Sequence, residues 1–434
     1  DDGIGDLDGI RARLDHLSWL GVDALWLSPF YPSPMADFGY DVSDYCGVDP
    51  IFGTLDDFDR LLAEAHERSI RIVIDWVPNH TSDQHPWFMA SRSSRDDPHR
   101  DWYIWRTGDR DSVPNNWRAA FAPDAPAWTF DEDSGQWYLH LFLPEQPDLN
   151  WAKPEVEAAM HDTLRFWLER GVDGFRMDVI HAIGKDPALP DNPAEVAALP
   201  HSMLNDHSST HGLLRRIRSV LEEYDGDRMM VGEVFLLDTA TVATYYGTGD
   251  ELHLSFNFPP LFTRWRADKW QKRLQEVADH VEPRGGWPTW VLSNHDNVRH
   301  RSRYGSEARA RAAAVLLLSL RGTPFLYAGE ELGSEDAVVT VDQAVDPGGR
   351  DGCRAPIPWD ATPQHGWGTT KPWLPWSPEP DLRNADTLRD DAGSILHLYR
   401  RILTARRGSP ALQQGEQRSL PAPDGVLCWC RARW

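Results

Sequence analysis

Short apolar runs alternate with amphipathic stretches along most of this chain of 434 residues. The runs are rich in β-branched and aromatic residues and occupy residues 22–27, 70–77, 172–177, 229–234, 289–292 and 324–327. Strands that are apolar on both faces are typical of a parallel sheet covered by helices. Helical periodicity marks residues 55–68, 154–170, 210–224, 265–281 and 306–320. Repeated β–α units of this kind predict either a (β/α)8 barrel or a large doubly wound sheet.

Polar side chains follow nearly every predicted strand. They are Asp75 to His80, Arg176 with Asp178, Glu233, Asn294 to Asp296, and Glu330 with Glu331. A barrel brings the C-terminal ends of its strands into one ring, whereas an open sheet spreads them along an edge. We therefore predict an α/β fold, a (β/α)8 TIM barrel, over residues 1–80 and 154–408.

Two long segments interrupt the repeat. Residues 81–153 are too many for an ordinary βα loop, so we predict an inserted domain after the third barrel strand that forms part of the substrate pocket. Residues 332–388 form a second long loop of the kind that often builds binding sites. Residues 409–434 look like the start of a truncated C-terminal β module. The first barrel strand is not visible, because residues 1–6 already look like a loop that leads into a helix.

Charge and composition narrow the class of partner. The formal net charge is −23, which argues against nucleic acid and anionic membranes, and no apolar run reaches the roughly 18 residues of a membrane span. The four cysteines stand in no paired metal-binding pattern, and they are Cys46, Cys353, Cys428 and Cys430. Isolated thiols without a visible signal peptide favour a cytoplasmic protein, monomeric or homodimeric, that acts on a neutral small molecule.

Asp178 follows Arg176 by two residues at the end of a strand, so both side chains point to the same face. A cation beside a carboxylate lowers its pKa and keeps it ionised, which a nucleophilic carboxylate requires. A purely structural Asp–Arg pair is the alternative.

Glu233 emerges from an apolar strand, where the neutral form of a carboxyl group is favoured, as a general acid needs. A helix-capping Glu is the alternative.

His295 and Asp296 end another strand. His295 is suited to donate to sugar hydroxyls, and Asp296 is suited to accept from them. For His295 a metal site is the rival interpretation, although no second His lies at ligand spacing.

Three carboxylates from three strand ends are what acetal hydrolysis needs. A nucleophile and an acid/base roughly 5–5.5 Å apart produce a covalent glycosyl-enzyme and net retention. The sequence contains no G-x-S-x-G elbow, no H-E-x-x-H and no Walker or dinucleotide-binding loop, so other hydrolytic and nucleotide-dependent classes lack support.

Five short motifs occur in order: DWVPNH (75–80), QPDLN (146–150), GFRMDV (174–179), VGEV (231–234) and SNHD (293–296). With them the chain resembles the α-amylase superfamily, glycoside hydrolase family 13, and within it the oligo-1,6-glucosidase and α-glucosidase branch. The resemblance spans essentially the whole chain. The chain departs from the pattern at both ends, because the first strand is not visible and the usual C-terminal β-sandwich would be cut off after Trp434.

The resemblance implies roles for single residues. Asp178 is the nucleophile, Glu233 the acid/base and Asp296 the supporting carboxylate. The positions that hold the non-reducing terminal glucose are matched by Asp37, Tyr40, His80, Arg176 and His295. Residues that match the pocket wall and a pocket-closing loop are Phe121, Phe142, Gln146, Arg350 and Arg354, with ordinary packing as the alternative for the aromatic rings.

Two further features follow from the resemblance. Val179 comes directly after the nucleophile, and in similar enzymes a Val there accompanies α-1,6 preference. One side chain contributes only about 1–3 kcal/mol of discrimination, so mixed activity is compatible with it. Asp2 and Asp6 match the second half of a calcium loop, with a solvated acidic turn as the alternative.

We therefore predict a retaining, exo-acting α-glucosidase for short oligosaccharides such as maltose and isomaltose, with α-1,6 slightly favoured over α-1,4. It needs no organic cofactor and binds at most one structural Ca2+. The first alternative is a glucosyl transferase or isomerase on the same scaffold, such as a trehalose synthase. The second is a non-catalytic binding subunit, which would typically lack the carboxylates that this chain retains.

Overall fold

The computed structural model describes residues 3–122, 124–368 and 371–432. The chain divides into two compact units. The sheet unit comprises Ala24–Leu236 and Thr244–Ser255, and the terminal unit comprises Asp1–Asp23, Leu237–Ala243 and Phe256–Trp434.

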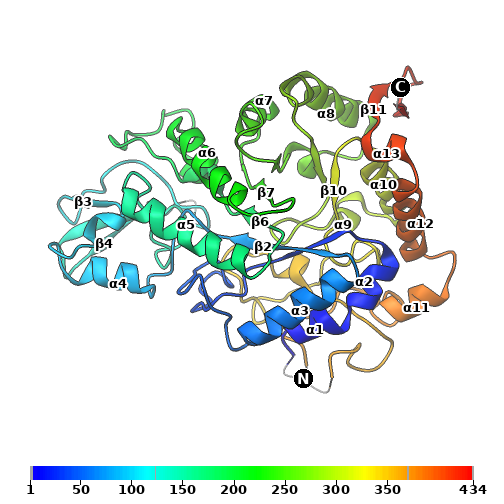
Figure 1. The fold of residues 1–434 in the computed structure, drawn as a ribbon, viewed down its shortest axis with the longest axis horizontal. Coiled ribbons are helices and arrows are strands. Elements are labelled where there is room, and N and C mark those ends of the chain that lie inside the picture. Colours follow the sequence, from blue (N-terminus) through cyan, green and yellow to red (C-terminus); the bar gives the residue numbers. More distant parts are fainter. Residues whose placement is uncertain (1–2, 123, 369–370, 433–434) are drawn as a thin grey trace. The chain divides into compact units, whose positions relative to one another are not determined.

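A five-stranded parallel sheet forms the centre of the sheet unit (Figure 1). Its order is β1-β2-β6-β7-β8, and the strands are β1 (Ala24–Leu27), β2 (Arg71–Trp76), β6 (Gly174–Met177), β7 (Met229–Gly232) and β8 (Leu254–Ser255). Four of these five strands fall in predicted apolar runs, and the short β8 has no such signal. The pairing places Asp75 beside Arg176 and Met177 beside Gly232, so the C-terminal ends of β2, β6 and β7 lie level with one another.

Three long helices connect these strands and match the predicted periodic stretches. They are α3 (Leu55–Glu67), α5 (Pro154–Glu169) and α6 (Ser209–Glu222). A capping box between Thr54 and Asp57 starts α3, and Pro154 occupies the first turn of α5, where its missing N–H costs nothing. Each helix buries an apolar stripe; that of α3 is Phe58, Leu61, Leu62 and Ala65.

Residues 81–153 lie within the sheet unit and contain a small antiparallel sheet. Its order is β3-β5-β4, and the elements of the segment are α4 (Pro86–Ser93), η1 (Arg100–Trp102), β3 (Trp105–Thr107), β4 (Trp128–Asp131) and β5 (Gln136–Leu139). Trp117, Trp128 and Trp137 form an apolar cluster with Val179, the residue after the predicted nucleophile. The compact units do not follow the predicted domain boundaries, which stay predictions. The remaining short helices of the sheet unit are η2 (Ile180–Ala182) and η3 (His201–Met203).

The terminal unit contains parallel strands β9 (Thr289–Val291) and β10 (Thr323–Phe325) and a helical group. In this group α2 (Leu14–Leu20), α10 (Glu307–Ser319) and α12 (Ile395–Arg407) bury Leu20, Leu318 and Tyr399 in a common apolar core. At residues 416–432 the antiparallel pair β11 (Glu416–Ser419) and β12 (Trp429–Ala432) follows α13 (Pro410–Gln414). The other helices of this unit are α1 (Leu7–Ala12), α7 (Thr239–Val242), η5 (Pro259–Phe262), α8 (Ala267–His280), η6 (Glu282–Arg284), α9 (His300–Tyr304), η7 (Asp351–Arg354) and α11 (Ala385–Asp390). The helix η4 (Ala243–Tyr246) belongs to the sheet unit except for its first residue.

None of the helices in the described part of the chain combines the length and the apolar character needed to cross a membrane.

Gly174 begins β6 where two backbones approach closely. A Cβ at this position would collide with the carbonyl oxygen of Met229 and would lie 2.8 Å from the Cγ of the same residue. We expect Gly174→Ala to lower the free energy of unfolding by about 1–3 kcal/mol, because backbone cannot move aside as a flexible side chain can. Urea unfolding followed by circular dichroism measures this change.

Gly212→Ala is the matched control. Gly212 lies inside α6, and its nearest neighbour would be the Nη1 atom of Arg216 at 3.5 Å. Alanine is the better helix former, so this variant should be as stable as the original chain or more stable. Equal losses for the two variants would contradict the close-approach explanation.

Candidate active site

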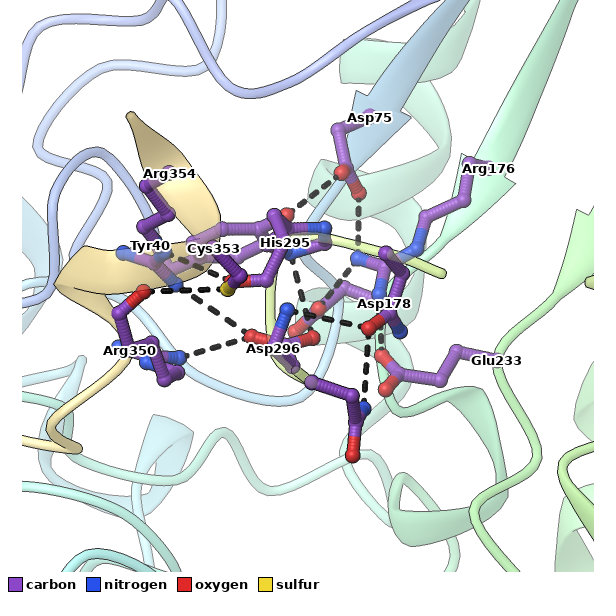
Figure 2. A network of polar contacts seen from close by, with 12 residues as sticks. Tyr40, Asp75, Arg176, Asp178, Glu233, His295, Asp296, Arg350, Cys353 and Arg354 are labelled. Carbon is purple, nitrogen blue, oxygen red and sulfur yellow. Dashed lines mark hydrogen bonds and ion pairs between the residues drawn. The ribbon is translucent and has the colours of Figure 1, made fainter. Parts of the chain in front are cut away.

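Arg176 is the buried centre of a carboxylate group at the ends of β2, β6 and β7. Its guanidinium group donates to Asp75 Oδ1 at 2.8 Å, to Asp178 Oδ1 at 2.5 Å and to Glu233 Oε2 at 2.5 Å (Figure 2). All four side chains are at most 9% exposed. We call these four residues the Arg176 cluster. The expectation that Arg176 and Asp178 share a face of the strand is confirmed by this contact.

Strand register assembles the cluster. The N–H of Asp178 donates to the Trp76 carbonyl at 2.8 Å, and the N–H of Glu233 donates to the Met177 carbonyl at 2.8 Å. Each carboxylate is thus the first residue beyond its strand but still bonded to the neighbouring strand. Val179 then turns the chain with a positive φ of 34°, a strained conformation for a β-branched residue. Its N–H donates to Glu233 Oε2 at 3.1 Å.

Burial changes the titration of the cluster. It raises the pKa of Asp178 well above its ordinary value; the Arg176 cation opposes this rise, and the Glu233 and Asp75 carboxylates add to it. Burial likewise raises the pKa of Asp75 to about 6, against the attraction of Arg176. The expected lowering of the Asp178 pKa by Arg176 is therefore outweighed, since one positive charge faces three carboxylates in a buried site.

Asp75 is a member of the site that we did not single out from the sequence. Its Oδ2 accepts from the Tyr40 hydroxyl at 3.0 Å and from Trp26 Nε1 at 3.2 Å, while its Oδ1 binds Arg176. It therefore orients both the cation and Tyr40. Its position at the start of the DWVPNH motif, near the end of β2, was the available signal, but only the strand register shows that it lies beside Arg176.

A second group of polar side chains joins the cluster through Tyr40. The carbonyl oxygen of Tyr40 lies 3.2 Å from His80 Nε2, and the same ring nitrogen lies 3.1 Å from Gln146 Nε2. Gln146 also donates to Asp37 Oδ2 at 3.1 Å, and the Phe142 ring lies 5.2 Å from the His80 ring. Burial lowers the pKa of His80 to about 4, so the imidazole is neutral near pH 7. The structure thus brings together five of the predicted substrate-binding residues.

The inserted segment supplies part of this group, and residues outside the segment bind it through Asp148. Asp148 of the QPDLN motif accepts from Lys185 Nζ at 2.9 Å and from Asn79 Nδ2 at 3.1 Å. Phe121, another of the predicted pocket residues, has its ring centroid 5.8 Å from that of Phe142.

The terminal unit holds the remaining predicted residues in a group of their own. Asp296 Oδ1 accepts from Arg350 Nη1 at 3.0 Å and from Arg354 Nη2 at 3.3 Å (Figure 2). Asp296 Oδ2 lies 3.3 Å from His295 Nε2, and Arg354 Nε donates to the carbonyl of His295 at 2.8 Å. The two arginines of the predicted pocket-closing loop therefore contact the predicted supporting carboxylate directly.

The predicted calcium ligands are described only in part. Asp2 lies outside the described residues, and the Asp6 carboxylate accepts from the Gly9 N–H at 2.6 Å as the N-cap of α1. Within the described ranges, no three or more His, Cys, Asp and Glu side chains are placed to hold a metal ion. The calcium site stays a prediction, and the proposed glycosidase reaction does not depend on it.

Comparison with known proteins identifies the family. The model of the alpha amylase catalytic domain matches residues 1–415. This chain belongs to the α-amylase family. Family membership confirms both the α/β class with a (β/α)8 barrel and the assignment as a glycoside hydrolase.

Individual relatives agree with this assignment. A probable alpha-glucosidase of Rhizobium meliloti (strain 1021) is 43% identical over 99% of this chain and 83% of its own length. An oligo-1,6-glucosidase of Parageobacillus thermoglucosidasius is 37% identical over 94% of this chain and 80% of its own length. Among solved structures, the alpha-glucosyl transfer enzyme XgtA superposes with a TM-score of 0.94 at 41% identity, covering 100% of this chain and 85% of XgtA.

The Arg176 cluster generates a pH-dependent prediction for this hydrolase. A nucleophilic carboxylate must be ionised, so activity falls as the pH drops through its pKa. Arg176→Gln removes the cation that opposes burial, which raises the pKa of Asp178 further. We expect the acid limb of the kcat/KM profile to move to higher pH and kcat/KM at pH 7 to fall on the order of 100-fold.

Arg165→Gln is the control, because Arg165 pairs with Glu223 and Asp162 on the surface. Its pH profile should be that of the unmodified enzyme. An unshifted acid limb in Arg176→Gln, measured on protein whose circular dichroism spectrum is native, would show that Arg176 does not tune the nucleophile.

Proposed function

We propose that this enzyme is a retaining, exo-acting α-glucosidase that releases terminal glucose from short oligosaccharides and favours α-1,6 slightly over α-1,4 linkages. The observation that carries the proposal is the sharing of one guanidinium group by Asp178 and Glu233. Two carboxyl groups held by one guanidinium group fit the roughly 5–5.5 Å separation of retaining glycosidases better than the roughly 6.5–9.5 Å separation of inverting enzymes.

The proposed reaction assigns one role to each carboxylate. Glu233 donates a proton to the glycosidic oxygen while Asp178 attacks the anomeric carbon, so that the C–O bond to the leaving sugar breaks and a glucosyl ester forms. Esterified Asp178 carries no charge, which removes repulsion from Glu233 once it has lost its proton. Glu233 then takes a proton from water, whose oxygen attacks the anomeric carbon and releases α-glucose and the Asp178 carboxylate.

The neighbouring groups support binding of a single terminal glucose. Tyr40 is oriented by its hydrogen bond to Asp75 and is suited to stack on the sugar ring. Neutral His80 and the Asp37 carboxylate, joined through Gln146, offer a donor and an acceptor to sugar hydroxyls. In this proposal Asp296 and His295 bind ring hydroxyls more tightly as the ring flattens toward the oxocarbenium-like transition state.

Transglucosylation is the second candidate, and the likeness to the alpha-glucosyl transfer enzyme XgtA favours its inclusion. Both reactions pass through the same glucosyl ester and differ in whether water or a sugar hydroxyl attacks it. The products of each reaction therefore distinguish them: hydrolysis of maltose or isomaltose yields free glucose, whereas transfer or isomerisation yields a new saccharide.

We expect a time course with isomaltose and maltose to show glucose as the main product, faster from isomaltose. Asp178→Ala should lower kcat at least on the order of 10^4-fold, because the covalent step is lost. Accumulation of a new disaccharide without glucose would assign the enzyme to the transferases instead.

Azide rescue with an activated aryl α-glucoside tests the roles of the two carboxylates. In Asp178→Ala, azide should attack from the vacated face and yield the β-glucosyl azide. In Glu233→Ala, azide should attack the glucosyl ester and yield the α-glucosyl azide. The opposite pairing of variants and anomers would reverse the assignment of nucleophile and acid/base.

Val179 supplies a test of linkage preference. Its side chain lies in the apolar cluster of the inserted segment. Val179 directly follows Asp178 in the sequence, and its N–H donates to Glu233. We expect Val179→Thr, which keeps the β-branched shape, to shift the ratio of kcat/KM for isomaltose to that for maltose about tenfold toward maltose. Because the readout is a ratio, a general loss of stability does not affect it, and an unchanged ratio would remove Val179 from the determinants of linkage.

A further inference from the structure

Asp346 is a buried carboxylate between the two arginines that contact Asp296. Its side chain is 0% exposed, in the loop that precedes η7, whereas the side chain of Asp296 is 27% exposed. The sequence analysis assigned it no role. The inference developed from it rests on the proposed role of Asp296 as the supporting carboxylate.

Arg350 and Arg354 both bridge the same two carboxylates. Arg350 donates to Asp346 from Nε at 2.9 Å and from Nη2 at 2.6 Å, and it donates to Asp296 from Nη1 at 3.0 Å. Arg354 donates to Asp346 from Nη1 at 3.3 Å and to Asp296 from Nη2 at 3.3 Å. Two of these three side-chain nitrogens of Arg350 thus donate to Asp346 and one donates to Asp296.

Asp346 is itself fixed by its own loop. Its Oδ2 accepts the backbone N–H of Arg350 at 2.7 Å, and its own N–H lies 3.2 Å from the Asp351 carboxylate, which also accepts the N–H of Val345 at 3.1 Å. On the other side of the loop, Cys353 Sγ donates to the carbonyl of His295 at 3.3 Å. These contacts hold Asp346, the ion-pair partner of both arginines, in place.

The charges of the group balance. Two guanidinium groups face two carboxylates, and although burial disfavours the charge of Asp346, hydrogen bonds from Arg350 and the nearby Arg354 lower the pKa of Asp346, so it stays ionised. Without the charge of Asp346, Asp296 would be the carboxylate that both Arg350 and Arg354 bind. Carboxylate oxygens that are saturated by arginine are less available to accept hydroxyl groups from a sugar.

We propose that Asp346 is a positioning residue for the glycosidase reaction: it holds Arg350 and Arg354 as its own ion-pair partners and so leaves Asp296 able to bind the transition state. Because the proposed contacts of Asp296 strengthen only as the ring flattens, the loss of Asp346 lowers kcat more than it raises KM.

The test uses Asp346→Asn, which keeps the shape of the side chain and removes its charge, with p-nitrophenyl α-glucoside as substrate. We expect kcat to fall on the order of 100-fold, as for a misplaced active-site group, while KM changes only a few-fold. Asp342→Asn is the matched control, because Asp342 is an exposed carboxylate of the same loop. Its kinetic constants should stay within about twofold of the original, as for other surface changes.

A charge-balance rescue separates positioning from a merely structural role. In Asp346→Asn/Arg354→Gln one guanidinium again faces one carboxylate, so kcat should rise above that of Asp346→Asn alone. Losses that multiply in the double variant would overturn the proposal, as would an unchanged kcat in Asp346→Asn. If Asp346→Asn alone does not fold, the double variant is compared with Arg354→Gln, and a further loss of kcat would count against the proposal. Should the unmodified enzyme cleave no α-glucoside, the proposed function fails and the role of Asp346 is not at issue.

Discussion

One buried guanidinium group organises the sheet unit of this α-amylase-family protein. Arg176 binds three carboxylates, and these come from the ends of three adjacent strands. Burying three carboxylates together would be prohibitive without a cation, and one cation neutralises only part of their charge. The cluster therefore holds its carboxyl groups close to one another and keeps the pKa values of Asp178 and Asp75 raised. Proximity of the carboxyl groups is a property that acetal cleavage uses, and Arg176 opposes the rise in the pKa of Asp178 that burial causes.

The parallel sheet supplies the precision that this cluster needs. In-register pairing places Asp75 and Arg176 side by side, and the backbone bonds of Asp178 and Glu233 continue the ladder one residue beyond β6 and β7. Side chains at these positions project from rigid backbone, and the strained turn at Val179 then carries the chain away while its N–H contacts Glu233. Functional side chains at the C-terminal ends of strands, with variable loops around them, are the general arrangement of barrel enzymes.

The terminal unit contains a second group of arginines and carboxylates, in which the numbers of opposite charges are equal. There two guanidinium groups are shared by two carboxylates, one buried and one partly exposed. In this second group, our proposal is that the ion pairs of the buried Asp346 leave Asp296 able to bind substrate. Loop residues such as Asp346 are thus as important to the proposed chemistry as the strand-end residues that form the recognisable motifs.

Local patterns were sufficient for much of this protein. The apolar runs located β1, β2, β6, β7, β9 and β10, and helical periodicity located α3, α5, α6, α8 and α10 to within a few residues at each end. The strand β8 was missed because its two residues, Leu254 and Ser255, carry no periodic signal. Asp75 and Asp346 were missed as members of functional groups because each looks like an ordinary polar residue beside a strand or in a loop.

The sequence by itself determined the α/β class, the family and the residues of the proposed site, because motifs and periodicity are properties of neighbouring residues. Only the tertiary structure decided how those residues share charge. Arg176 contacts Asp75 and Glu233 from 101 and 57 positions away, so neither the partners of the cation nor the upward direction of the Asp178 pKa follows from the motif around it. The balance between burial and attraction depends on how many charges are buried together, and that number is set by the fold.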